Sequence, residues 1–246
     1  MIRRPATLAA AVLTVAALAV PAPALAGPAP SAAGSTTAAE TIGAPKAWAA
    51  GFDGSGVGIA LIDTGVSPHP QLQDRVAATI DVSGDGRIND GHGHGTFLAG
   101  LVVGDQDPDG ALGVAPGAHL VSVKVADADG QTSLDRVLAG MAVIRETREA
   151  LGTRVVVLAL GGPADEIPDP LEEALEQLWA EGFVVVVASG NDGEGAVSEP
   201  GTSPYLITVG AVDDGGTADP ADDTLPDWSS RGEGRQGVTK PEILAP

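Results

Sequence analysis

Short apolar runs, each rich in β-branched residues, recur along the chain and are separated by longer segments of mixed polarity. Runs that are apolar on both faces are typical of parallel strands in a sheet covered by helices on both sides. We therefore predict five strands, at residues 57–63, 120–125, 155–160, 183–188 and 206–212.

The segments between these runs carry helical patterns. One spans Ser133–Ala150 and another Pro170–Glu181, where Asp169 stands at the N-cap position and Gly182 follows the end. A shorter helix is expected around residues 45–48. Alternating strands and helices predict an α/β fold, a doubly wound and mainly parallel sheet with helices on both faces. A length of 246 residues suits one well-buried domain.

The N-terminal segment has the pattern of an export signal. Arg3 and Arg4 precede an apolar stretch, and Ala24-Leu25-Ala26 offers small residues for cleavage. The stretch is shorter than the ~20 residues that span a membrane. We interpret residues 1–26 as a signal peptide, residues 27–41 as a short flexible link and residues 42–246 as the folded domain. The mature protein is then expected to be secreted and free of the membrane. Its export would use either the general or the twin-arginine route.

Charge and cysteine content exclude several classes of function. The chain has 33 acidic and 13 basic residues, a net charge of −20, which opposes binding to nucleic acid and to anionic lipid. It has no cysteine, so thiol catalysis and disulfides are excluded.

Two polar positions stand out as candidate chemistry. Asp63 ends the first apolar run, and open α/β sheets place their sites just beyond such strand ends. His94 lies among small residues at the start of an expected helix. Zinc binding by His92 and His94 is disfavoured because no third histidine or cysteine lies nearby. The glycines at 51–58 precede a strand rather than follow one, which is the wrong order for dinucleotide binding.

Eight short motifs follow one another along the chain. They are Ile62-Asp63-Thr64-Gly65, His94-Gly95-Thr96, Gly113-Val114-Ala115-Pro116, Leu160-Gly161-Gly162, Ala188-Ser189-Gly190-Asn191, Thr208–Val212, Trp228–Gly232 and Lys240–Pro246. With these motifs in this order, the chain resembles the subtilisin-like serine proteases, or subtilases. The resemblance covers nearly all of the chain after the signal segment.

The resemblance implies a role for each matching residue. Asp63 would orient and stabilise the imidazole of His94, which would act as general base and then general acid. Asn191 would donate a hydrogen bond to the oxyanion. The segment Leu160-Gly161-Gly162 would line the pocket for the residue before the scissile bond. Polypeptides are the implied substrates, and a monomer without a cofactor for the chemistry is expected.

The nucleophilic serine of the family is not matched. It would follow the segment 240–246, where this chain ends. Ser203 has suitable neighbours in Gly201-Thr202, but Pro204 and a strand pattern follow it instead of a helix. We expect an incomplete catalytic domain; the alternative is a catalytically dead module that binds peptides. Incompleteness is favoured because the absent helix would leave strand faces uncovered.

Calcium is the remaining candidate ligand. The loop Asp81–Asp90 partly imitates an EF-hand loop, but its twelfth position is His92 rather than a bidentate glutamate. We interpret it as an acidic turn before the His94 helix, with structural calcium left open there and in the loop at 105–109. No metal is required for the implied chemistry.

Overall fold

The computed structural model describes residues 37–105, 113–162 and 169–246. The expected signal peptide, most of the expected link and most of the loop at 105–109 lie outside these residues. The last five residues of the expected link, Thr37–Thr41, form the short helix α1.

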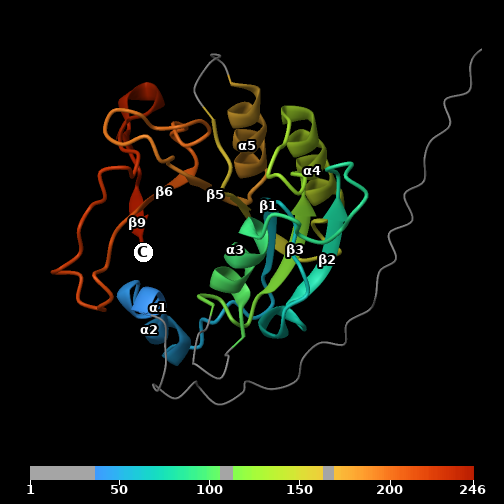
Figure 1. Cartoon of the computed structure of the whole chain (residues 1–246), viewed down its shortest axis with the longest axis horizontal. Coiled ribbons are helices and arrows are strands. Elements are labelled where there is room, and N and C mark those ends of the chain that lie inside the picture. Colours follow the sequence, from blue (N-terminus) through green and yellow to red (C-terminus); the bar gives the residue numbers. More distant parts are fainter. Residues whose placement is uncertain (1–36, 106–112, 163–168) are drawn as a thin grey trace, which may run out of the picture.

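A seven-stranded parallel sheet forms the centre of the molecule (Figure 1). Its order is β2-β3-β1-β4-β5-β6-β9. The chain passes from β1 to β2 at one edge, returns through β3, and then continues from β4 to β9 on the other side of β1, which confirms the expected doubly wound fold. The strands are β1 Gly58–Asp63, β2 Val76–Asp81, β3 His119–Lys124, β4 Thr153–Leu158, β5 Val184–Ala188, β6 Ile207–Ala211 and β9 Ile243–Ala245. A separate antiparallel ribbon pairs β7 Gly232–Glu233 with β8 Thr239–Lys240.

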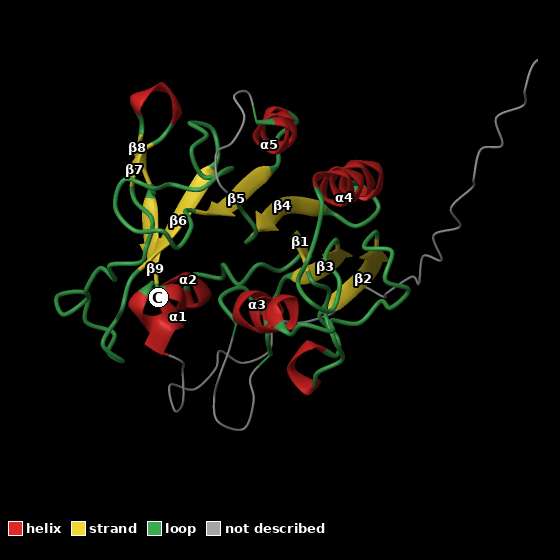
Figure 2. Ribbon diagram, turned by 45° about the horizontal axis from the view of Figure 1, so that its top comes forward, coloured by secondary structure: helices red, strands yellow, loops and turns green. Residues whose placement is uncertain are grey.

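Helices lie on both sides of this sheet (Figure 2). Helices α4 and α5 lie on one side, and α3 lies on the other together with α1 and α2. The remaining helix bounds are α2 Ala44–Ala49, α3 His94–Val103, α4 Leu134–Thr147 and α5 Pro170–Ala180, with short 3-10 turns η1 Pro70–Leu72 and η2 Arg235–Gly237. The N-cap prediction for α5 is confirmed, because the Asp169 carboxylate accepts hydrogen bonds from the N–H groups of Leu171 and Glu172.

Each face of the sheet contributes to its own hydrophobic core. Val156 and Leu158 of β4 and Val185 and Val187 of β5 are buried on the side of α4 and α5. On the other side, Leu61 of β1 and Leu120 of β3 pack with the buried residues of α3. Strand β1 is buried at all six positions because it lies between β3 and β4 and has cover on both faces.

The face on the α3 side is only partly covered beyond β4. Val186 of β5 is aligned with Ile207 of β6, and Val209 of β6 with Ile243 of β9, so these side chains share that face. Ile207 is 37% exposed and Ile243 52% exposed, whereas Val185 and Val187 on the opposite face are buried. An apolar sheet face is therefore left open to solvent over the last three strands.

Candidate active site

Asp63 is the last residue of β1, and its side chain is only 1% exposed. A carboxylate in such a place needs hydrogen-bond donors to offset its desolvation. The N–H of Thr64 donates to its Oδ1 over 2.7 Å. The strand therefore delivers a buried, hydrogen-bonded carboxylate to the carboxyl edge of the sheet.

His94, the first residue of α3, meets this carboxylate directly. Its Nδ1 lies 2.8 Å from Oδ1 and 2.9 Å from Oδ2 of Asp63. A carboxylate only accepts, so Nδ1 carries the proton and Nε2 is the nitrogen that is able to take one up. The side chain of His94 is 37% exposed. The pair thus joins a buried acceptor to an imidazole within reach of a ligand.

Two glycines allow the start of α3 to approach the end of β1. Gly93 has φ 101°, a left-handed conformation that favours glycine. A Cβ on Gly95 would lie 2.2 Å from the carbonyl oxygen of Gly65 and 3.1 Å from Oδ1 of Asp63. Gly93 therefore permits the left-handed turn into α3, and Gly95 permits close packing of the helix onto the strand end.

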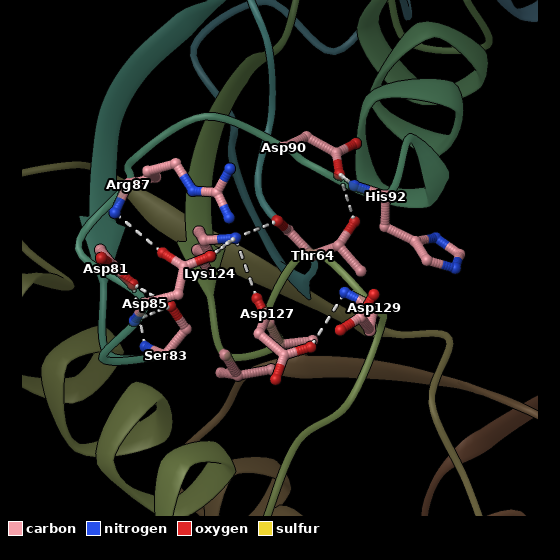
Figure 3. A network of polar contacts seen from close by, with 12 residues as sticks. Thr64, Asp81, Ser83, Asp85, Arg87, Asp90, His92, Lys124, Asp127 and Asp129 are labelled. Carbon is pink, nitrogen blue, oxygen red and sulfur yellow. Dashed lines mark hydrogen bonds and ion pairs between the residues drawn. The ribbon is translucent and has the colours of Figure 1, made fainter.

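Asp90 is a functional candidate that the sequence reasoning placed only in an acidic turn. Its two oxygens accept hydrogen bonds from Thr64 and His92, as Figure 3 shows, and from Gly93 and Thr96. Desolvation of the carboxyl group raises its pKa, but these hydrogen bonds outweigh it and lower the pKa to about 2. The available signal was its spacing, four residues before His94.

Lys124 is a second residue that sequence reasoning missed. It ends β3 in register with Asp63, and its side chain is fully buried. Its Nζ donates to the carbonyl oxygens of Thr64 and Ala126, both over 2.9 Å, and lies 3.2 Å from Oδ2 of Asp85 (Figure 3). This ammonium therefore holds the turn that follows Asp63.

The other predicted site residues follow neighbouring strands at the same edge. Leu160, Gly161 and Gly162 come after β4. The strand predicted at residues 155–160 ends at Leu158, two residues earlier than expected. Gly162 exchanges two backbone hydrogen bonds of 3.1 Å with Glu199. Asn191 is exposed just beyond β5. Because β1, β4 and β5 are adjacent and parallel, all these residues lie at one edge of the sheet.

Ser203 lies apart from the imidazole. Its Oγ donates to Oε1 of Glu176 on α5 over 2.8 Å. Helix α5 is on the opposite side of the sheet from α3, which begins with His94 (Figure 2). The dismissal of Ser203 as the partner of His94 therefore agrees with the geometry.

The acidic loop uses its carboxylates within the protein. Asp81 accepts hydrogen bonds from the N–H and the hydroxyl of Ser83, and Asp85 pairs with Lys124. Across the described residues, no cluster of three or more acidic or histidine side chains is arranged to hold a metal ion. The same part of the chain contains no helix long and apolar enough to cross a membrane.

The chain is similar to known proteins over most of its length. The model of the subtilase family matches residues 54–246. Serine protease AprX of Bacillus subtilis (strain 168) is 39% identical over 205 residues, which are 78% of this chain and 46% of that protein. Subtilisin Savinase of Lederbergia lenta is 40% identical over 170 residues, which are 69% of this chain and 61% of its length.

A solved structure shares the fold. Sphericase superimposes with a TM-score of 0.66 at 30% identity, over 79% of this chain and 67% of its own. The chain thus spans about half to three fifths of the length of the curated relatives named above.

Proposed function

The chain belongs to the subtilase family, and from that premise we propose that it is part of an exported serine endopeptidase whose acid and base are Asp63 and His94. The observation that carries the proposal is the contact of 2.8 Å between Nδ1 of His94 and Oδ1 of Asp63. It joins a fully buried carboxylate to a partly exposed imidazole, which is the geometry that a general base requires.

The proposed reaction is hydrolysis of a peptide bond through a serine hydroxyl. His94 would take the hydroxyl proton on Nε2 as the oxygen attacks the carbonyl carbon, and would then give that proton to the leaving amine. Asp63 would hold the imidazole in the tautomer with Nδ1 protonated and would stabilise the imidazolium. Asn191, exposed at the same edge, would donate to the oxyanion.

The hydrogen bonds of the backbone after β4 indicate which residue would pair with an extended substrate. The N–H and C=O groups of Gly162 already bond to Glu199. Successive residues of an extended segment point these groups in opposite directions, so those of Gly161 face away from Glu199. We therefore assign substrate pairing to the backbone of Gly161, and the lining of the adjacent pocket to Leu160 and Gly162.

The open sheet face supports the proposal that a segment outside these 246 residues supplies the nucleophile. Ile207 and Ile243 are apolar and exposed on the side of α3, where a helix would bury them. A module shaped only for peptide binding would instead carry polar residues there. The catalytically dead peptide-binding module remains the second candidate function and is an outcome of the test.

The test compares the chain of 246 residues with the product of the coding frame continued beyond codon 246. We expect the continued product to hydrolyse casein, with loss of hydrolysis in His94→Ala and retention in His69→Ala, a change at an exposed histidine. The chain of 246 residues is expected to be inactive. A stop codon directly after codon 246 would favour the binding module, and hydrolysis that survives His94→Ala would refute the mechanism.

Export forms a separate part of the proposal. It is supported by the charged, apolar and small-residue pattern of residues 1–26. Amino-terminal sequencing of the protein from the culture medium should begin at Gly27. An intact Met1 in the cell fraction would contradict export.

A further inference from the structure

Helix α3 begins without a cap from its own N-cap residue. Gly93 stands at that position and has no side chain to accept the free N–H groups of the first turn. Asp90 takes over this task. Its Oδ1 accepts from the N–H of Gly93 over 2.7 Å, and its Oδ2 accepts from the N–H and hydroxyl of Thr96 over 2.9 and 2.6 Å. The carboxylate thereby fixes the turn that carries His94.

The same carboxylate also holds the end of β1 through Thr64. The hydroxyl of Thr64 lies 2.9 Å from Oδ1 of Asp90 and accepts from the N–H of Gly95 over 2.9 Å. Thr64 follows Asp63 directly and is almost completely buried. Asp90 is therefore linked to both elements that contribute the acid and base, as Figure 3 shows on the side of Thr64 and His92.

The hydroxyl proton of Thr64 has two acceptors within reach. Its oxygen lies 2.9 Å from Asp90 and 3.2 Å from Oδ1 of Asp63. A hydroxyl donates one hydrogen bond, and the shorter contact is to Asp90. Oδ1 of Asp63 is the oxygen that lies 2.8 Å from Nδ1 of His94. With its proton directed to Asp90, the hydroxyl of Thr64 is oriented so that its oxygen accepts the N–H of Gly95, the residue after His94.

We propose that Asp90 is a positioning residue that sets the hydrogen bond between His94 and Asp63, by capping α3 and by orienting the hydroxyl of Thr64. The catalytic meaning of this role rests on the proposed function, whereas the hydrogen bond itself is a property of the fold. With a pKa lowered to about 2 by its hydrogen bonds, Asp90 is a carboxylate throughout the neutral range.

The experiment follows the Nδ1 proton of His94 by NMR in the chain of 246 residues labelled with ¹⁵N-histidine. A proton held between imidazole and carboxylate resonates at low field and exchanges slowly with water. Asp90→Asn keeps the size of the side chain but places an NH₂ group against donors. We expect this proton to exchange about tenfold faster in the variant, the effect of one weakened hydrogen bond.

Variants of Thr64 test the path. Thr64→Val removes the hydroxyl at nearly constant volume and should also speed exchange, while Thr64→Ser should restore the rate of the parent chain. In the double variant Asp90→Asn/Thr64→Val, the exchange rate of the His94 proton should rise by less than the product of the two single-variant increases. The reason is that both residues act through one contact. If Asp90→Asn does not fold, the comparison of Thr64→Val with Thr64→Ser still decides the path.

Asp169→Asn is the matched control. Asp169 also accepts two N–H groups at a helix start, but on α5. Asp169→Asn should lower the melting temperature without changing the exchange rate of the His94 Nδ1 proton. Equal exchange rates in Asp90→Asn and the parent chain, or an equal effect of Asp169→Asn, would overturn the proposal. Absence of proteolysis in any longer product would refute only the proposed function.

Discussion

Arg235 provides the sharpest test of how the buried charges stabilise this fold. Its guanidinium pairs with Glu172 in the first turn of α5 and lies 3.2 Å from Glu176. Glu172 is fully buried. Burial raises its pKa above the usual 4.5, hydrogen bonding to Arg235 opposes that change, and the nearby charge of Glu199 adds to it. Arg235→Met would leave Glu172 without its cationic partner.

The expected loss follows from the burial of the acid. Removing one partner of a buried ion pair costs about 3 to 5 kcal/mol. The Arg235 side chain is 32% exposed, so we expect the lower end, about 3 kcal/mol. For a domain of this size, that lowers the melting temperature by roughly 6 to 12 °C.

The pH dependence has a definite sign. A glutamate whose pKa is raised in the folded state stabilises the fold below its unfolded pKa, and that contribution is lost as pH rises through the folded pKa. Without Arg235, the pKa of Glu172 rises further. The destabilisation by Arg235→Met should therefore be greater at about pH 8 than at about pH 5.

Urea unfolding at both pH values measures this difference. The matched control is Arg145→Met, since the Arg145 side chain is also 32% exposed but its partner Glu181 is 45% exposed. That change should cost less than about 1 kcal/mol. Adding Glu172→Gln to Arg235→Met should recover part of the loss. An effect of Arg235→Met no larger than that of Arg145→Met would refute the reasoning.

Three further predictions concern the site. The fall in the pKa of Asp90 from 3.8 to about 2 corresponds to about 2.4 kcal/mol, which solvent screening reduces to about 1 to 1.5 kcal/mol. This contribution is present above pH 3.8 and is lost as pH falls through about 2. The free energies of unfolding of Asp90→Asn and the parent, measured in urea, should therefore differ at neutral pH and converge in acid. Equal values at neutral pH would contradict this. Gly95→Ala should cost about 1 to 3 kcal/mol through its clash with the Gly65 carbonyl; an unchanged melting temperature would contradict this. Lys124→Met should cost about 2 to 4 kcal/mol by leaving two buried carbonyls without a donor, and calorimetry of a variant as stable as the parent would disprove it.

The sequence predicted the parts of the fold that have strong periodic signals. The five apolar runs became β1, β3, β4, β5 and β6, because both faces of these strands require apolar residues. Strand β2 was missed because it lies at the sheet edge, where its burial alternates and polar residues are tolerated. Strand β9 has only three residues, too few for a pattern.

The site was predictable where a motif and a strand end coincided. Asp63 and His94 were identified in this way, and the structure brings them into contact. Asp90 and Lys124 were not identified, because their importance comes from partners 26 and 60 residues away along the chain. No local pattern records such pairings. The contact of Lys124 with Thr64 arises when β3 lies beside β1, and that of Asp90 with Thr64 arises when the start of α3 packs against the end of β1.

The open face over β5, β6 and β9 has a consequence for the chain in solution. Two copies that meet through Ile207 and Ile243 would bury apolar surface, but each copy carries a net charge of −20. Long-range repulsion between the copies opposes this meeting at low ionic strength and fades when the screening length shrinks to about 10 Å in 0.1 M salt. Colloidal stability of the isolated chain is thus governed by electrolyte, and dilute buffer is the condition that keeps it dispersed.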